Sequence, residues 1–268
     1  MEDLEELVEH GRVGVEDPTS KRENSSRVTI ILVIIQIALY LASCLVGGAL
    51  VNPARLTLLE WGLVQKQYIA CALCGYVLEL RRLLLPTFLH LGPFHLASNA
   101  VFQLLVGPTV EKSLGSRKFL IVFLTAGLFG NLLAAAASET SAGASTACYG
   151  LLGVGIAQTW LSWPDMDAAT QLAAQDRLKR EGLWLLVWEI LGWNSLAHFG
   201  HLGGLIAGMC LTVTFSDSVT DRSVKMQRNA KVIMLVTGLA CTLIIFVPVL
   251  RNFSTARSNC ASLMYIYN

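Results

Sequence analysis

The residues of this chain that could do chemistry begin with a serine in a run of small side chains. The run Gly143-Ala144-Ser145-Thr146 opens an apolar stretch that continues to about Trp163. A serine hydroxyl is a poor nucleophile unless a neighbouring base takes its proton as it attacks. Small residues are also usual where membrane helices pack closely. This stretch alone therefore fits either a packing seam or a nucleophile.

A histidine later in the chain could be that base. His201 lies in a run where Gly200, Gly204 and Gly208 recur at every fourth position. Such a glycine face lets another helix come close. Two glycine-lined helices can therefore bring an imidazole against the hydroxyl of Ser145.

Composition shows the surroundings in which these residues would act. The chain has 268 residues, of which 54% are hydrophobic and 15% are charged, whereas soluble domains carry about 25% charged residues. Sparse charge with long apolar runs predicts an all-α polytopic membrane protein. No nucleic-acid partner is expected. The seven cysteines are odd in number and scattered, so no disulfide framework is predicted, and Cys71-Ala-Leu-Cys74 is a weak redox or metal signal.

Seven apolar segments are predicted to span the membrane. Six form a core over 28–215, and a basic cytoplasmic loop at 216–231 precedes the seventh. The amphipathic, aromatic residues 51–92 predict a membrane-associated loop. The tails are 1–27 and 251–268, cytoplasmic and outer respectively, and no cleavable signal peptide is expected. The predicted spans are about 28–50, 93–110, 119–138, 144–163, 174–193, 196–215 and 232–250.

The positions of the basic residues predict the orientation. With the N-terminus in the cytoplasm, 14 of the 20 lysine and arginine residues lie on the cytoplasmic side, as membrane proteins prefer. The plasma membrane or a secretory-pathway membrane is the expected location. In this topology Ser145, His201, His95 and Asn99 all lie a few residues below the outer surface. Polar groups inside a membrane are costly and are functional hypotheses by default.

The spacing of these groups resembles the signature of rhomboid intramembrane serine proteases. The matching residues are His90-x4-His95-x3-Asn99, Gly143-Ala144-Ser145 and His201-x-Gly203-Gly204-x3-Gly208. The match runs from the loop near Arg82 to the end of the sixth span. The resemblance implies a six-helix core with a seventh C-terminal transmembrane helix, the 6+1 or secretase-like type.

The resemblance also implies a role for each matching residue. Ser145 would be the nucleophile and His201 the general base, with His95 and Asn99 in the oxyanion hole. Glu111 matches a structural glutamate of the family. Single-span transmembrane proteins in the bilayer would be the substrates, cut near their outer or lumenal end without metal or cofactor. The supporting residues would be Gly143, Tyr149, His90, Gly204 and Gly208, with Tyr149 packed against the imidazole.

Two positions depart from the family pattern. Arg81-Arg82 stands where the family often has Trp-Arg, which bears on how the first loop is anchored. Thr146 stands where the family often has glycine after the serine. A threonine there narrows the approach of substrate unless its side chain points away.

Several alternatives stay open. A catalytically weak, rhomboid-like client-binding protein would be expected to lose Ser145 or His201, and both are present. A transporter usually shows internal repeats and a midplane site, which this sequence lacks. A metal pair of His198 and His201 would need a further ligand, and no carboxylate or cysteine is expected at that depth. Glu189 is expected to face a polar pocket or a helix end. The tryptophans Trp184, Trp188 and Trp193 fit a substrate-side gate or, preferentially, lipid-facing anchors.

Overall fold

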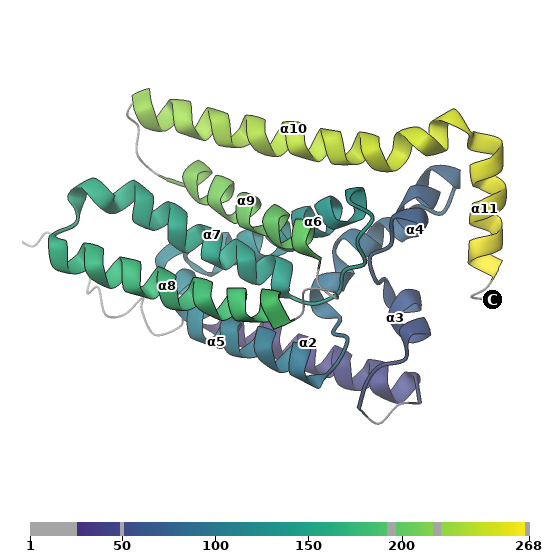
Figure 1. Cartoon of the computed structure of the whole chain (residues 1–268), viewed down its shortest axis with the longest axis horizontal. Coiled ribbons are helices and arrows are strands. Elements are labelled where there is room, and N and C mark those ends of the chain that lie inside the picture. The colour runs from purple at the N-terminus through teal and green to yellow at the C-terminus, as the bar shows by residue number, and fades with distance from the viewer. Residues whose placement is uncertain (1–25, 49–50, 192–196, 217–220, 266–268) are drawn as a thin grey trace, which may run out of the picture.

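The computed structural model describes residues 26–48, 51–191, 197–216 and 221–265, and these ranges are almost entirely helical (Figure 1). They contain no strand beyond one isolated bridge between Val64 and Ser141. The predicted all-α fold is therefore confirmed. The N-terminal tail 1–25 and Trp193 lie outside the described residues, as do the ends of several predicted spans.

Each of the seven predicted segments contains a long helix. Three of them begin three or more residues earlier than predicted, α6, α8 and α10, because polar residues continue the helix beyond the apolar stretch. Asp167 caps the early start of α8 by accepting a hydrogen bond from the Thr170 amide at 2.7 Å, and this bond lowers the pKa of the Asp167 carboxyl. The long helices are α2 (Arg27–Val46), α5 (Pro93–Leu114), α6 (Ser116–Ala136), α7 (Ser145–Ser162), α8 (Ala168–Leu191), α9 (His198–Thr214) and α10 (Asp221–Arg251).

Three stretches of the described chain are long and apolar enough to cross a membrane by length and composition alone. They are Arg27–Val46, Ser116–Ala136 and Ser223–Arg251. The polar and glycine residues of α5, α7, α8 and α9 lower the apolar content of those helices. These are also the helices that carry the candidate site.

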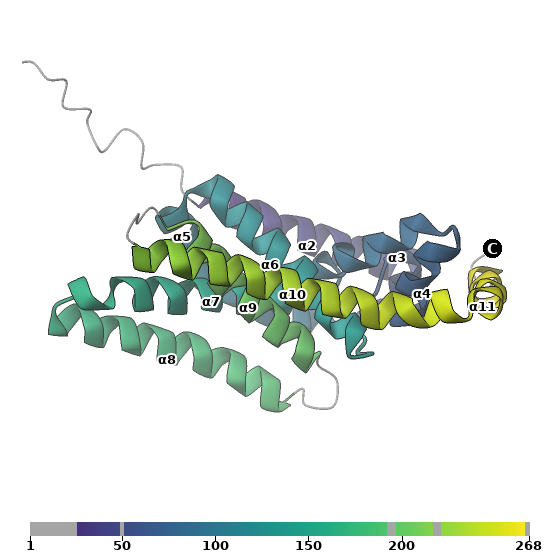
Figure 2. The ribbon, with the colours of Figure 1, turned by 90° about the horizontal axis from the view of Figure 1, so that it is seen from above.

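Helices α6, α7 and α9 form the centre of the bundle (Figures 1 and 2). The contact between α7 and α9 requires glycine. A Cβ atom on Gly204 would lie 1.9 Å from the Thr146 carbonyl oxygen, and one on Gly208 would lie 2.0 Å from the Gly150 carbonyl oxygen. The two backbones therefore touch, which brings the start of α7 against the start of α9.

The remaining long helices surround this centre. Helices α2 and α5 pair along one side, where Gln36 and Gln103 exchange side-chain hydrogen bonds of 2.9 Å. Glu111 of α5 is fully buried and accepts hydrogen bonds from the amides of Val28 and Thr29 at 3.1 and 2.9 Å. This carboxylate satisfies the free amides at the start of α2. Helix α8 lies at the edge of the bundle opposite α2, and Leu185 is its only buried residue (Figure 2).

The loop between α2 and α5 folds into short helical pieces. Residue Arg82 anchors it, although its neighbour is Arg81 rather than tryptophan. The Arg82 side chain is 1% exposed, pairs with Glu79, and donates to the carbonyls of Leu59 and Leu63 at 2.6 and 3.0 Å. The pieces are α3 (Arg55–Trp61), α4 (Lys66–Ala70), η1 (Cys71–Cys74), η2 (Val77–Leu83) and η3 (Leu85–Phe88).

Replacing Arg82 by alanine should lower the free energy of unfolding by about 3–5 kcal/mol, because the buried Glu79 carboxylate would lose its buried partner and keep only the more distant, partly exposed Arg81, 3.7 Å away. Thermal unfolding in detergent measures the loss. Arg81→Ala is the matched control, since the Arg81 side chain is 38% exposed and should cost about 1 kcal/mol or less. Equal losses in the two variants would contradict the anchoring role of Arg82.

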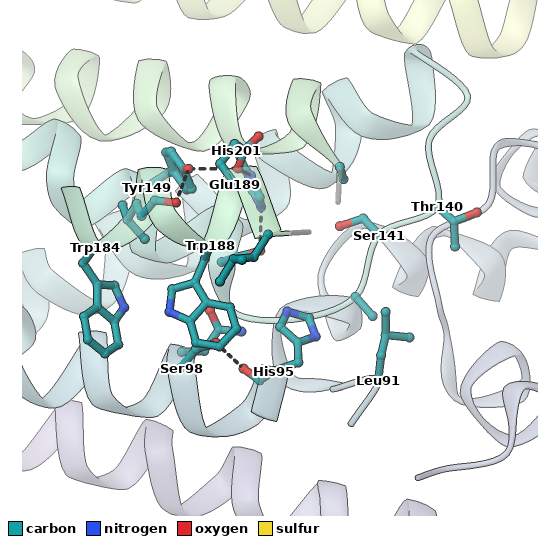
Figure 3. A pocket seen from close by; sticks show the side chains of 16 residues that line it. Leu91, His95, Ser98, Thr140, Ser141, Tyr149, Trp184, Trp188, Glu189 and His201 are labelled. Carbon is teal, nitrogen blue, oxygen red and sulfur yellow. Dashed lines mark hydrogen bonds and ion pairs between the residues drawn. The ribbon is translucent and has the colours of Figure 1, made fainter. Parts of the chain in front are cut away.

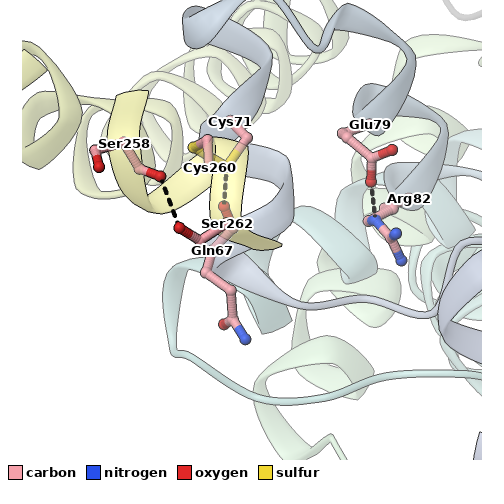
Figure 4. The surroundings of a disulfide bond; sticks show 7 residues. All are labelled: Gln67, Cys71, Glu79, Arg82, Ser258, Cys260 and Ser262. Atoms are coloured by element: carbon pink, nitrogen blue, oxygen red, sulfur yellow. Dashed lines mark hydrogen bonds and ion pairs between the residues drawn. A yellow bond between two sulfur atoms is a disulfide. The ribbon is translucent and has the colours of Figure 1, made fainter. Parts of the chain in front are cut away.

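A disulfide joins this loop to the C-terminal segment, whereas the scattered cysteines had predicted no disulfide framework. Cys71 of η1 is bonded to Cys260 of α11 (Phe253–Tyr265), 189 residues away (Figure 4). Helix α11 covers most of the predicted C-terminal tail; it turns off the end of α10 and packs beside α4 and η1 (Figure 1). Cys74 is free, so Cys71 and Cys74 are not a CxxC pair. Only the fold-back of α10 and α11 brings the bonded cysteines together, and no local spacing reveals it.

Candidate active site

The loop before α7 holds Ser145 at the first position of that helix. The Gly143 amide donates to the Pro86 carbonyl at 2.8 Å, and the Ala144 amide donates to His90 Nε2 at 3.4 Å. Gly143 has φ +117°, a conformation that side chains disfavour. The first amides of a helix have no intrahelical acceptor, and no side chain caps this end of α7. These amides can therefore bind an anion.

The start of α9 is fixed by a carboxylate from the loop between α6 and α7. Glu139 accepts hydrogen bonds from the amides of Phe199 and Gly200 at 3.1 and 3.3 Å. A negative charge stabilises a helix N-terminus. One turn further on, the imidazole of His201 stacks on the Tyr149 ring, with centroids 4.4 Å apart and 9° between the planes. The predicted packing of Tyr149 against that imidazole is present.

Ser145 and His201 are in direct contact. His201 Nε2 lies 2.9 Å from the Ser145 Oγ, and His201 is 4% exposed. The pair lines a cavity of about 240 Å³ between α5, α7, α8 and α9 (Figure 3). The same cavity is lined by His95 and Asn99, so all four polar residues predicted to share one depth lie in one place.

His95 and Asn99 present buried hydrogen-bonding atoms with no partner among the described residues. These atoms are His95 Nε2 and Asn99 Nδ2. A Cβ atom on Gly143 would lie 2.6 Å from the first and 3.3 Å from the second. Both therefore face the backbone two residues before Ser145. Buried polar groups without partners are rare in folded proteins, and these two residues line the same cavity as Ser145.

Glu189 is a candidate site residue to which sequence reasoning assigned no role. Its carboxylate accepts a hydrogen bond from the Tyr149 hydroxyl at 2.9 Å, lies 2.6 Å from His201 Nδ1, and contacts His198 Nδ1 through the other oxygen. This contradicts the expectation that no carboxylate joins the two histidines. The sequence feature that could have identified Glu189 is a glutamate inside an apolar helix, which is costly unless it has partners. The described residues include no group of three or more His, Cys, Asp or Glu side chains suited to a metal ion.

Three more residues near the cavity differ from expectation or refine it. Thr146 is fully buried against Gly130 and Gly200, so its side chain points away from the cavity and does not narrow it. Trp184 and Trp188 line the cavity (Figure 3), which corrects the preference for lipid-facing anchors. Both residues lie on the face of α8 that forms one side of the cavity.

The fold is that of a helical membrane protein, and its central helices bring a serine and a histidine into contact at one cavity. A family model for the rhomboid domain matches residues 77–218. This range covers more than half of the chain and includes the whole candidate site. The chain belongs to the rhomboid family.

Individual relatives agree with this membership. Rhomboid-like protease 1 of Toxoplasma gondii is 35% identical over 146 residues, which are 53% of this chain and 50% of the relative. Rhomboid-like protease 2 of the same organism is 31% identical over 199 residues, 70% of this chain and 65% of the relative. Inactive rhomboid protein 2 of Homo sapiens is 27% identical over 162 residues, 59% of this chain and 18% of the relative. The chain thus spans half to about two thirds of the two Toxoplasma proteins.

Proposed function

We infer that this chain is an intramembrane serine endopeptidase that cuts single-span transmembrane proteins with Ser145 and His201. The observation that carries this proposal is the 2.9 Å contact between His201 Nε2 and the Ser145 Oγ. In the proposed reaction, Ser145 attacks the peptide carbonyl carbon while its proton moves to His201 Nε2. The same proton then passes to the leaving amine as the peptide bond breaks.

The surroundings of the pair support acyl transfer over simple packing. A tetrahedral intermediate places negative charge on the former carbonyl oxygen, which preorganised donors stabilise. Asn99 Nδ2, His95 Nε2 and the uncapped start of α7 supply such donors. A water molecule that enters the cavity from the outer surface would hydrolyse the acyl-enzyme.

Orientation and substrate form part of the same proposal. The Cys71–Cys260 disulfide favours an oxidising compartment for the first loop and α11, which agrees with the outer side predicted from the basic residues. A transmembrane helix ties up its carbonyls in i→i+4 hydrogen bonds. A client must therefore unwind near its outer end, where Gly or Pro lowers the cost. The plasma membrane or a secretory-pathway membrane with a cytoplasmic N-terminus fits these features.

A client-binding protein without proteolysis is the second candidate, because inactive rhomboid protein 2 is similar over 162 residues. The two candidates separate in one experiment with the purified chain and a model single-span client in proteoliposomes. We expect a fluorophosphonate probe to label Ser145 and mass spectrometry to map both client fragments to a cut near the outer end. Stable client capture without fragments or labelling would favour the binder. Cleavage at the cytoplasmic end would contradict the proposed topology.

A further inference from the structure

The second nitrogen of His201 has a partner of its own. Its Nε2 faces Ser145 at 2.9 Å, and its Nδ1 faces Glu189 Oε2 at 2.6 Å. The imidazole therefore lies between a hydroxyl on α7 and a carboxylate on α8. The two ring nitrogens have opposite roles in a neutral histidine, and the partner of one determines the role of the other.

The Glu189 carboxylate is itself held in place from two helices. The Tyr149 hydroxyl on α7 donates to Oε2 at 2.9 Å, and His198 on α9 contacts Oε1. Its side chain is only 17% exposed. Among the described residues that line the cavity, Glu189 is the single carboxylate (Figure 3). These contacts place the Glu189 carboxylate against the candidate base, whereas sequence reasoning expected it only in a polar pocket or at a helix end.

We propose that Glu189 completes a Ser145–His201–Glu189 triad, in which it acts as the positioning residue for His201. The proposal rests on the proposed proteolytic function and adds a third member to the Ser145–His201 pair. Glu189 accepts a hydrogen bond from the Nδ1–H group of His201, so the proton stays on Nδ1 and Nε2 is free to receive the proton of Ser145. When that transfer makes His201 a cation, the carboxylate stabilises the charge and is not itself protonated.

The helix that carries Glu189 gives this arrangement a further property. Ser145, His201, His95 and Asn99 come from α5, α7 and α9, while α8 has Leu185 as its only buried residue. The triad is therefore complete only while this lightly packed helix lies against α7, so that the Glu189 side chain reaches His201 on α9.

The test removes the negative charge of Glu189 while nearly keeping the size of the side chain. Glu189→Gln should lower kcat on the order of 10²- to 10⁴-fold, as when the acid of a serine-protease triad is lost, with KM for the client within about twofold. Glu189→Asp keeps the charge and should retain a clearly higher kcat than Glu189→Gln. The rate of fluorophosphonate labelling of Ser145 should fall in parallel with kcat.

Controls separate positioning from structure. Glu181→Gln removes another partly buried carboxylate of α8, one that pairs with Arg177, and should keep parental kcat. In a Ser145→Ala background, Glu189→Gln should leave crosslinking of the client unchanged. Parental kcat in Glu189→Gln, or equal losses in Glu189→Gln and Glu189→Asp, would overturn the triad while cleavage by the parent still supported the proposed function. A parent that neither cleaves nor labels would instead remove the proposed function.

Discussion

Replacing Ser145 by alanine should reduce cleavage of a single-span client to background, and His201→Ala should do the same. Removal of the nucleophile or the base of a serine protease costs on the order of 10⁶-fold in kcat. The 2.9 Å contact places both residues in one proton-transfer step, so the losses should not add in the double variant. Reconstituted enzyme with a fluorogenic or gel-resolved client measures them.

A matched serine on the same helix controls for general effects of the substitution. Ser162 is exposed at the far end of α7, and Ser162→Ala should cleave at the parental rate. Both site variants should unfold at temperatures close to that of the parent, because Ser145 and His201 lie at a cavity surface. Near-parental turnover in His201→Ala would show that the assignment of the base is wrong.

Replacing Asn99 by alanine should lower kcat by about 100- to 1,000-fold, the usual effect of losing one oxyanion donor. The reason is the buried Nδ2 atom, which has no partner among the described residues and faces the backbone before Ser145. KM should change little, since the developing charge exists only in the transition state. Steady-state kinetics with a series of client concentrations separates the two constants.

The opposite result has a clear meaning. An unchanged kcat with a raised KM would make Asn99 a residue that positions the substrate. His95→Ala offers an independent variant in the same wall of the cavity, because His95 Nε2 is also buried without a partner in the described residues. A loss confined to kcat in both variants would favour an oxyanion hole shared by α5 and the start of α7.

Much of the fold could be predicted because membrane helices follow from local composition. The length of the apolar runs predicts the segments, and the four-residue spacing of Gly200, Gly204 and Gly208 predicts a close helix contact. The ends of α8 and α10 were predicted less well, since a helix continues into polar residues wherever a cap such as Asp167 allows it. Hydropathy marks where a chain is apolar, not where its helix begins.

The candidate site divides in the same way. Ser145, His201, His95 and Asn99 could be placed together because the topology puts them at one depth, and the structure brings them into one cavity. The contact of Glu189 with His201 could not be predicted, because it depends on how α8 packs against α7. Contacts between segments with no fixed spacing, such as Arg82 with the carbonyls of Leu59 and Leu63, were hidden for the same reason.

The bond between Cys71 and Cys260 also has a consequence for biosynthesis. The two cysteines are 189 residues apart, so at about 5–20 residues per second the second thiol is made about 10–40 s after the first. During that interval the helices of the site are synthesised, and Cys71 remains a thiol with the free thiol of Cys74 nearby. The disulfide therefore closes after the bundle and locks a finished arrangement. An oxidase that acted too early would meet Cys71 without its native partner.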